Sequence, residues 1–140
     1  MSCCDRGPLA DAPMTNRIRQ TANNRLGAVY SALYGFWSAR HAAVTVGRQG
    51  GVGARRDAYS VILFNSTTTS ILASDFTSTP DQLLGAMLPY QAGGGTNFSE
   101  ALRAGGVVME QNWSTERLVS WSSVSICAFF NDDFFYLERR

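Results

Sequence analysis

One stretch of the chain, Ala58–Phe64, constrains the fold more than any other. It is a nearly continuous run of apolar, β-branched and aromatic side chains. A run with so little polar alternation is typical of a central strand that is buried on both faces of a sheet. The chain has 140 residues, of which 45% are hydrophobic and 16% charged, so we expect one domain with a real core. That composition excludes a charge-driven disordered chain and a coiled coil.

The residues before this strand divide into an irregular part, a helix and a loop. Residues 1–23 contain prolines and small polar residues without a sustained period, which predicts irregular structure. Apolar residues then recur at helical spacing, and Asn24 is suited to cap the first turn, so we expect a helix over residues 24–40. The glycine-rich segment 47–53 predicts a flexible loop.

A hairpin and a short helix are predicted after the central strand. Residues 65–66 favour a turn, and residues 69–73 favour a second, shorter strand. Thr79 and Pro80, with Gln82 at the capping-box position, then mark the start of a helix.

The most specific feature of the sequence is a glycine-rich loop that opens another helix. Asn97 is the expected cap of that helix, and Glu100 lies three positions later, as in a capping box. An apolar stripe continues to about Asn112. Strands and helices in this order predict an α/β fold in which helices are layered against a sheet. The loop residues that we single out as a candidate site are Gly93, Gly94, Gly95, Thr96 and Asn97.

The last part of the chain, residues 118–140, differs in character from the rest. It is rich in serine, and it holds four of the eight phenylalanines of the chain. The apolar and β-branched content of residues 119–130 predicts a strand, and residues 131–133 predict a turn.

Charge and cysteine content exclude several classes of function. The net charge is +1 and no residue is lysine, so a P-loop, a Schiff base and a basic surface for nucleic acid or membrane are not expected. Three cysteines and the single His41 lack the spacing of a zinc site. An odd and sparse cysteine count fits a reduced, intracellular (cytoplasmic) protein.

Chemistry at the glycine-rich loop is one hypothesis for the function. Exposed N–H groups at a helix N-terminus attract anions, so the Gly93–Thr96 loop would suit a hydrolase or transferase as an anion site. The sequence offers no lysine after the glycines, no histidine with a serine and an aspartate in catalytic order, and no paired carboxylates on one element. We therefore expect that the protein is not an enzyme.

These motifs together resemble a von Willebrand factor A domain of the type found in intracellular fungal proteins. The resemblance covers residues 1–117, and it implies a doubly wound, Rossmann-like sheet flanked by helices. It also implies a module for protein–protein interaction. The segments that carry the resemblance are Asn24–Val29, Asp57–Phe64, Asp75–Pro80 and Gly93–Phe98.

The resemblance implies a metal-ion-dependent adhesion site, of which this sequence carries only a part. The family holds Mg²⁺ with an Asp-x-Ser-x-Ser loop after the first strand, a threonine, and an aspartate after the fourth strand. Thr96 matches the threonine, whereas the first strand with its loop is missing and the last strand is altered. Asp5, Asp132 and Asp133 are the carboxylates left to substitute. A single hydroxyl is a poor Mg²⁺ site, so we expect no bound Mg²⁺.

We therefore hypothesise that the chain is a fragment. It consists of a partial von Willebrand factor A domain over residues 1–117 and a divergent segment over residues 118–140. Its expected function is binding of an unknown protein partner through a defective adhesion site. The alternatives are an enzyme with the anion site described above, or a truncated product without function. Loss of the first strand leaves one edge of the central strand open, and the C-terminal segment is the nearest candidate to fill it.

Overall fold

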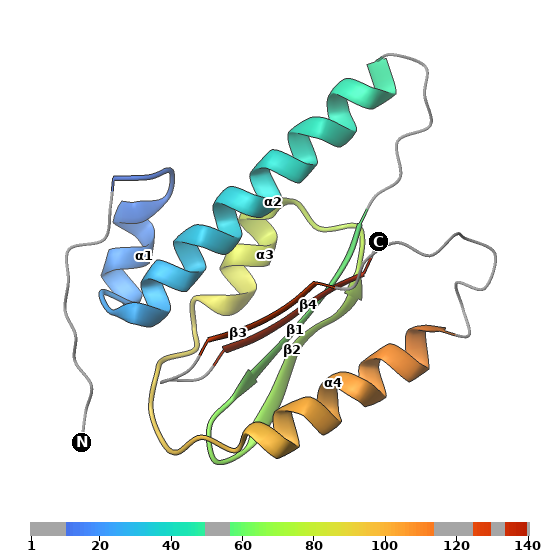
Figure 1. The fold of residues 1–140 in the computed structure, drawn as a ribbon. Helices are drawn as coiled ribbons and strands as arrows, with labels where there is room; N and C mark the ends of the chain where they lie inside the picture. Colours follow the sequence, from blue (N-terminus) through green and yellow to red (C-terminus); the bar gives the residue numbers. More distant parts are fainter. Residues whose placement is uncertain (1–10, 50–56, 114–124, 130–133, 140) are drawn as a thin grey trace. The chain divides into compact units, whose positions relative to one another are not determined.

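The computed structural model describes residues 11–49, 57–113, 125–129 and 134–139. These residues fall into two units. One unit, Met1–Arg56 with Thr77–Gln91, contains three helices, and the other, Asp57–Phe76 with Ala92–Arg140, contains the strands and one helix (Figure 1). The chain is therefore an α/β mixture, as the sequence predicts.

The helical unit begins with a helix that the sequence did not predict. Helix α1 (Thr15–Thr21) lies within the segment expected to be irregular, so that prediction was wrong there. Ile18 is completely buried, and the Thr15 hydroxyl accepts a hydrogen bond from the N–H of Ala12 at 3.0 Å. A helix of seven residues is too short to show a period, and tertiary burial stabilises it.

Helix α2 (Arg25–Gln49) begins where the sequence predicts and ends later. The Asn24 side chain caps it by accepting a hydrogen bond from the N–H of Gly27 at 3.2 Å. The predicted loop over 47–53 was wrong for residues 47–49, which are helical, and residues 50–53 lie outside the described part of the chain. A glycine costs a helix only about 1 kcal/mol, so Gly47 alone does not end one.

Helix α3 (Pro80–Met87) forms with the predicted capping box. The Thr79 hydroxyl accepts from the N–H of Gln82 at 3.4 Å, and the Gln82 side chain accepts from the N–H of Thr79 at 2.8 Å. Two tyrosines join α2 to this region: Tyr30 donates to the carbonyl of Tyr90 and Tyr34 to the carboxylate of Asp81, each at 3.2 Å.

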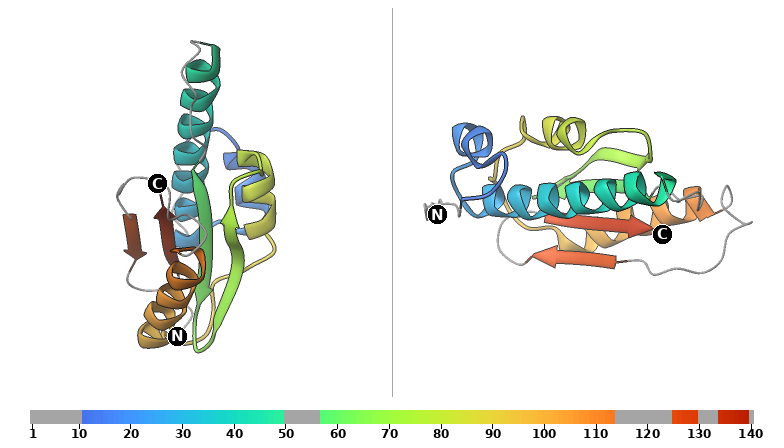
Figure 2. Two further views of the ribbon diagram at one scale, coloured as in Figure 1. Left: turned by 90° about the vertical axis from the view of Figure 1, so that its right-hand side faces the viewer. Right: turned by 90° about the horizontal axis from the view of Figure 1, so that it is seen from above.

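The other unit contains a four-stranded sheet with the order β2-β1-β4-β3 (Figure 2). Strand β1 confirms the predicted central strand, and every residue from Tyr59 to Phe64 is buried. Strand β2 confirms the predicted second strand and is longer than expected. The strands are β1 (Ala58–Phe64), β2 (Thr68–Asp75), β3 (Ser125–Phe129) and β4 (Phe134–Arg139).

All strand pairs in this sheet are antiparallel among the described residues. A doubly wound sheet is built from parallel strands joined by crossover helices. The doubly wound arrangement that the resemblance implies is therefore not confirmed. The described strands form an antiparallel pair of β1 with β2 and another of β3 with β4, joined by the antiparallel pairing of β1 with β4.

The C-terminal segment supplies the strand beside β1. Of the strand predicted over 119–130, residues 125–129 are strand β3, and the remainder lies outside the described part of the chain, as does the turn predicted over 131–133. The second neighbour of β1, opposite β2, is β4, a strand that the sequence did not predict; Leu63 pairs with Phe134 and Ala58 with Arg139. The C-terminal segment thus fills the edge of the central strand.

Strand β2 departs from a regular ladder in two places. The register shifts between Tyr59 and Val61 and again between Val61 and Ile62. Ser74 adopts a left-handed backbone with φ of 51°, and its N–H donates to the Ser60 hydroxyl at 2.8 Å. Bulges of this kind increase the local twist and limit pairing with further strands at an edge.

Helix α4 (Phe98–Trp113) confirms the helix predicted after the glycine-rich loop. It packs on β1 through Phe98, whose ring lies 6.3 Å from that of Phe64 at an interplanar angle of 60°. Ala101 is fully buried in the same cluster, and Met109 is partly buried against it. The glycine-rich loop at the start of α4 is therefore held next to the end of β1.

We expect Ile62→Asp to unfold the protein, because Ile62 is 1% exposed and an unpaired buried charge costs about 3–5 kcal/mol. Far-ultraviolet circular dichroism and urea denaturation measure this. The matched control is Thr69→Asp on exposed β2, which should change the free energy of unfolding by less than about 0.5 kcal/mol. Native circular dichroism of Ile62→Asp would contradict the central position of β1.

The buried phenol of Tyr30 predicts a loss of stability at alkaline pH. Burial raises the pKa of Tyr30, and the neighbouring Tyr90 raises it further. Because the folded-state pKa is above the unfolded value, this contribution is complete below about pH 10 and is lost as the pH rises further.

Thermal unfolding between neutral and alkaline pH tests this prediction with two variants. Tyr30→Phe should remove the alkaline loss and should cost about 1 kcal/mol at neutral pH, because the Tyr90 carbonyl loses its donor. Tyr34→Phe retains Tyr30 and should keep the alkaline loss. An identical alkaline profile in Tyr30→Phe would show that other groups cause it.

Candidate functional site

The glycine-rich loop is joined to the turn between β1 and β2 by two backbone donors. The N–H of Gly95 donates to the Ser66 hydroxyl at 3.1 Å, and the N–H of Asn97 donates to the carbonyl of Asn65 at 2.7 Å. Gly95 and Ser66 are 29 positions apart in the sequence. We refer to residues 65–67 together with residues 93–97 as the loop–turn surface.

The turn is itself held by hydrogen bonds centred on Asn65. Its side-chain oxygen accepts from the N–H of Thr67 at 2.8 Å and from the Thr67 hydroxyl at 3.1 Å. Its N–H donates to the carbonyl of Thr67 at 2.8 Å. An asparagine that bonds its own backbone two residues on is a standard turn-former, so residues 65–66 form the turn that the sequence predicts.

Two of the three glycines lie where the loop approaches the turn closely. Gly94 has a φ of 97°, and a Cβ there would lie 3.2 Å from the Cβ of Asn65. A Cβ on Gly95 would lie 3.0 Å from the Ser66 hydroxyl oxygen, whereas one on Gly93 would meet nothing within 4 Å. The close backbone approach that glycines indicate is thus made to the protein's own turn.

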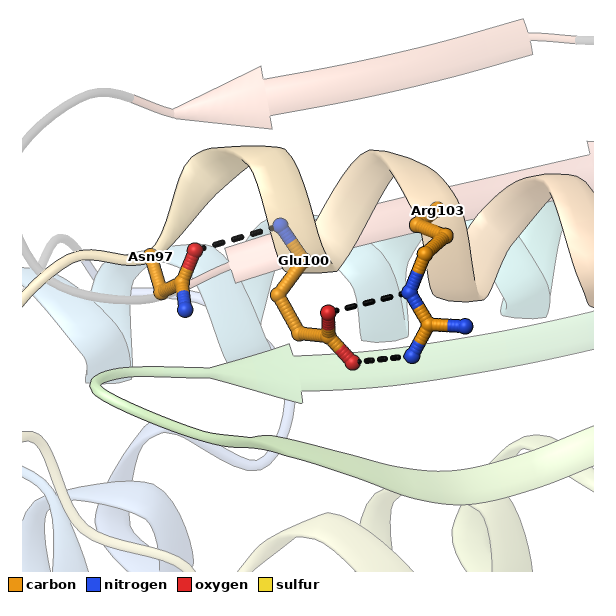
Figure 3. Close-up of polar contacts among 3 residues, drawn as sticks. All are labelled: Asn97, Glu100 and Arg103. Carbon is orange, nitrogen blue, oxygen red and sulfur yellow. Dashed lines mark hydrogen bonds and ion pairs between the residues drawn. The ribbon is translucent and has the colours of Figure 1, made fainter.

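The N-terminus of α4 is capped by Asn97, whose side-chain oxygen accepts from the N–H of Glu100 at 3.2 Å (Figure 3). The reciprocal half of the predicted capping box does not form. The N–H of Asn97 bonds to Asn65 instead, and the Glu100 carboxylate forms a two-point ion pair with Arg103 (Figure 3).

The Glu100–Arg103 ion pair sets the charge state at the start of α4. The hydrogen bond from Arg103 lowers the pKa of Glu100, and the same bond raises the pKa of Arg103. Arg103 is exposed and Glu100 is half-buried, so water still screens the pair. The main consequence of the ion pair is that the charges of Glu100 and Arg103, which lie close to the loop–turn surface along the chain, neutralise each other.

The hydrogen bonds at the start of α4 do not favour the hypothesis of an anion site. An anion at a helix N-terminus needs backbone N–H groups that point toward it. The N–H groups of Gly95 and Asn97 already donate to the turn, and the Glu100 N–H donates to the Asn97 side chain. Three donors that an anion would use are therefore bonded within the protein.

The metal hypothesis rests on Thr96, which is exposed. Among the described residues no group of three histidine, cysteine or acidic side chains comes close enough to hold a metal ion. The carboxylate in the first turn of α4, Glu100, is paired with Arg103. The candidate substitutes Asp5, Asp132 and Asp133 lie outside the described part of the chain. Hydroxyl and amide groups alone do not fit the oxygen shell that Mg²⁺ requires.

Sequence reasoning singled out the glycine-rich loop and missed its partner. Asn65 and Ser66 were predicted only as a turn, yet they bond to the loop and define where Thr96 lies. The local signal for this was limited to the turn-forming tendency of asparagine and serine. Gly95 and Ser66 are 29 positions apart, so the sequence does not show that the loop bonds to the turn.

Comparison with known proteins identifies no relative: no family model, no curated protein and no solved structure matches the chain. Within the described ranges, none of the helices has the length and apolar character needed to cross a membrane.

We expect Gly94→Ala and Gly93→Ala to differ in their effect on stability. Gly94→Ala should cost about 1–3 kcal/mol, because it forces a side chain into a left-handed backbone that crowds Asn65. Gly93→Ala is the matched control, and it should be neutral because its Cβ meets open space. Urea denaturation of both variants checks this, and equal effects would show that the loop does not pack on the turn.

Proposed function

We propose that this chain is a protein–protein interaction module of von Willebrand factor A type. It is not an enzyme and acts inside the cell, and it uses the loop–turn surface to contact a protein partner. The observation that carries the proposal is the pairing of the glycine-rich loop with the residues that follow β1.

The position of Thr96 supports this proposal. The resemblance implies that the threonine of the adhesion site lies at the carboxyl edge of the sheet. Residues Asn65 and Ser66 directly follow Phe64, the last residue of β1, and both bond to residues adjacent to Thr96. Thr96 therefore lies near the carboxyl end of β1, and this position supports its match to the family's threonine.

The order of elements supports the same family. A long helix, a buried strand, an antiparallel neighbour, a capped helix, the glycine-rich loop and a further helix follow one another along residues 25–113. In the proposal this part, within residues 1–117, is the von Willebrand factor A region. Residues 118–140 are a divergent segment whose strand β4 runs antiparallel beside β1.

The proposed contact does not use a metal ion. Among the described residues no group of three histidine, cysteine or acidic side chains could hold a metal ion, and the Glu100 carboxylate is paired with Arg103. The adhesion site is therefore defective in this proposal, and hydroxyl, amide and backbone groups of the loop–turn surface make the contact.

The enzyme alternative is less well supported. An anion site for a hydrolase or transferase would draw on backbone N–H groups of the loop, and those of Gly95 and Asn97 are already bonded. We therefore retain the interaction module as the proposed function.

Capture from a cell extract, followed by reconstitution with the purified partner, tests the proposal. Thr96→Ala should weaken binding by about tenfold, which is about 1.4 kcal/mol, as expected when a contact residue is truncated. Thr45→Ala removes an exposed threonine of α2 and should leave binding unchanged. Removal of divalent cations with EDTA should also have no effect. A partner that binds both variants equally would contradict the proposal.

Amide chemical shifts of the isotope-labelled protein separate the alternatives. Titration with MgCl₂ or with inorganic phosphate should leave the amides of residues 93–97 unshifted. Saturable shifts with Mg²⁺ would show that the adhesion site is intact, and shifts with phosphate would favour the anion-site enzyme.

A further inference from the structure

Strand β3 forms an open edge of the sheet. The strand order β2-β1-β4-β3 leaves two outer strands, and among the described strands β3 pairs with β4 alone. Within the described part of the chain, no strand therefore pairs with the N–H and C=O groups on the other side of β3. A row of backbone donors and acceptors of this kind is a template for a further strand.

Strand β3 lacks the features that usually protect a strand edge. Natural sheets protect their edges with charged residues, prolines, bulges or very short strands. Residues 118–131, which include β3, contain no charged residue and no proline. The pairing of β3 with β4 runs residue by residue, from Ser125 with Glu138 to Phe129 with Phe134, without a register shift. The strand has five residues, which is an ordinary length.

The other outer strand, β2, is protected. Its register against β1 shifts twice between Tyr59 and Ile62, and Ser74 has a left-handed backbone. Bulges of this kind twist an edge away from regular pairing. The sheet thus has one edge that is suited to accept a strand and one that is not. Two such sheets joined through their open edges leave only the protected β2 edges outside, so the assembly closes at two copies.

We propose that the chain forms a homodimer in which β3 of one copy pairs antiparallel with β3 of a second copy. A two-fold axis relates two identical antiparallel strands, so each copy supplies the strand that the edge of the other lacks. With the axis at Cys127, the middle residue of β3, all five residues pair. The strand order of the dimer is then β2-β1-β4-β3-β3-β4-β1-β2.

The charge on the neighbouring strand is compatible with this dimer. Glu138 of β4 pairs with Ser125, at one end of β3. An axis at Cys127 places the two copies of Glu138 at opposite ends of the joined strands, about 14 Å apart along them at about 3.4 Å per residue. That separation exceeds the Debye length of about 8 Å at physiological ionic strength, so repulsion between the two carboxylates is screened.

Sedimentation equilibrium of the full chain over a range of concentrations tests the proposal. We expect a reversible equilibrium between monomer and dimer, without larger species. Cys127→Lys places two lysines directly opposite each other at the axis, and it should weaken the dimer about fivefold or more, because like charges there destabilise a strand pair. Cys127→Ser is the neutral control. Ser70→Lys places the same charge on exposed β2, and both of these variants should retain the dimer.

A variant of opposite charge distinguishes loss of pairing from loss of folding. Cys127→Glu alone should also weaken the dimer. An equal mixture of Cys127→Glu and Cys127→Lys should restore it, because opposite charges then face each other across the axis. Restoration shows that both variants are folded and that residue 127 of one copy lies opposite residue 127 of the other.

Four results would overturn the proposal. One is a chain that stays monomeric at every concentration. The second is a dimer that Cys127→Lys forms as readily as the parent chain, and the third is a dimer that Ser70→Lys disrupts, which would place the contact at β2. The fourth is a series of larger species, which would show that the assembly does not close at two copies. These measurements do not involve Thr96, so they leave the interaction module at the loop–turn surface to its own test.

Discussion

Burial of β1 is the constraint on which the sheet depends. Val61 and Ile62 are successive residues and point to opposite faces, and both are almost inaccessible to water. Each face must therefore be covered and each edge paired, because buried backbone groups without partners are costly. Helix α4 covers β1 through Phe98 and Ala101, while β2 and β4 satisfy its two edges.

The candidate site is a consequence of the same strand. Where β1 ends, its chain turns at Asn65, and the carbonyl of Asn65 and the hydroxyl of Ser66 accept from the glycine-rich loop. Packing of Phe98 on Phe64 holds the start of α4 next to that turn. A local core contact and two long-range hydrogen bonds therefore fix Thr96 at the end of the sheet, and these features support the proposed interaction surface.

The two edges of the β1–β2 hairpin differ in whether a further strand pairs with them. On one side, β4 adds a strand from the C-terminal segment. On the other, β2 carries no charge over Thr68–Ser74, and such an edge would readily pair with another chain. Its register shifts and the left-handed Ser74 interrupt the regular ladder, which limits that pairing.

The sequence by itself determined the elements whose signals are local. The apolar run of β1, the capping box of α3 and the Asn97 cap of α4 each follow from neighbouring residues, and all three form as expected. The glycines predicted a close backbone approach. Their spacing could not say to what, because hydrogen bonds to Ser66 and Asn65 span long distances along the chain.

Only the tertiary structure decided the features that depend on burial or distant pairing. Helix α1 is too short for a period and forms around the buried Ile18. Strand β4 was not predicted, because its position in the sheet depends on its pairing with β1, which is distant in the sequence. The antiparallel pairing of every described strand also lies beyond local signals, since strand direction is fixed by which segments meet and not by their composition.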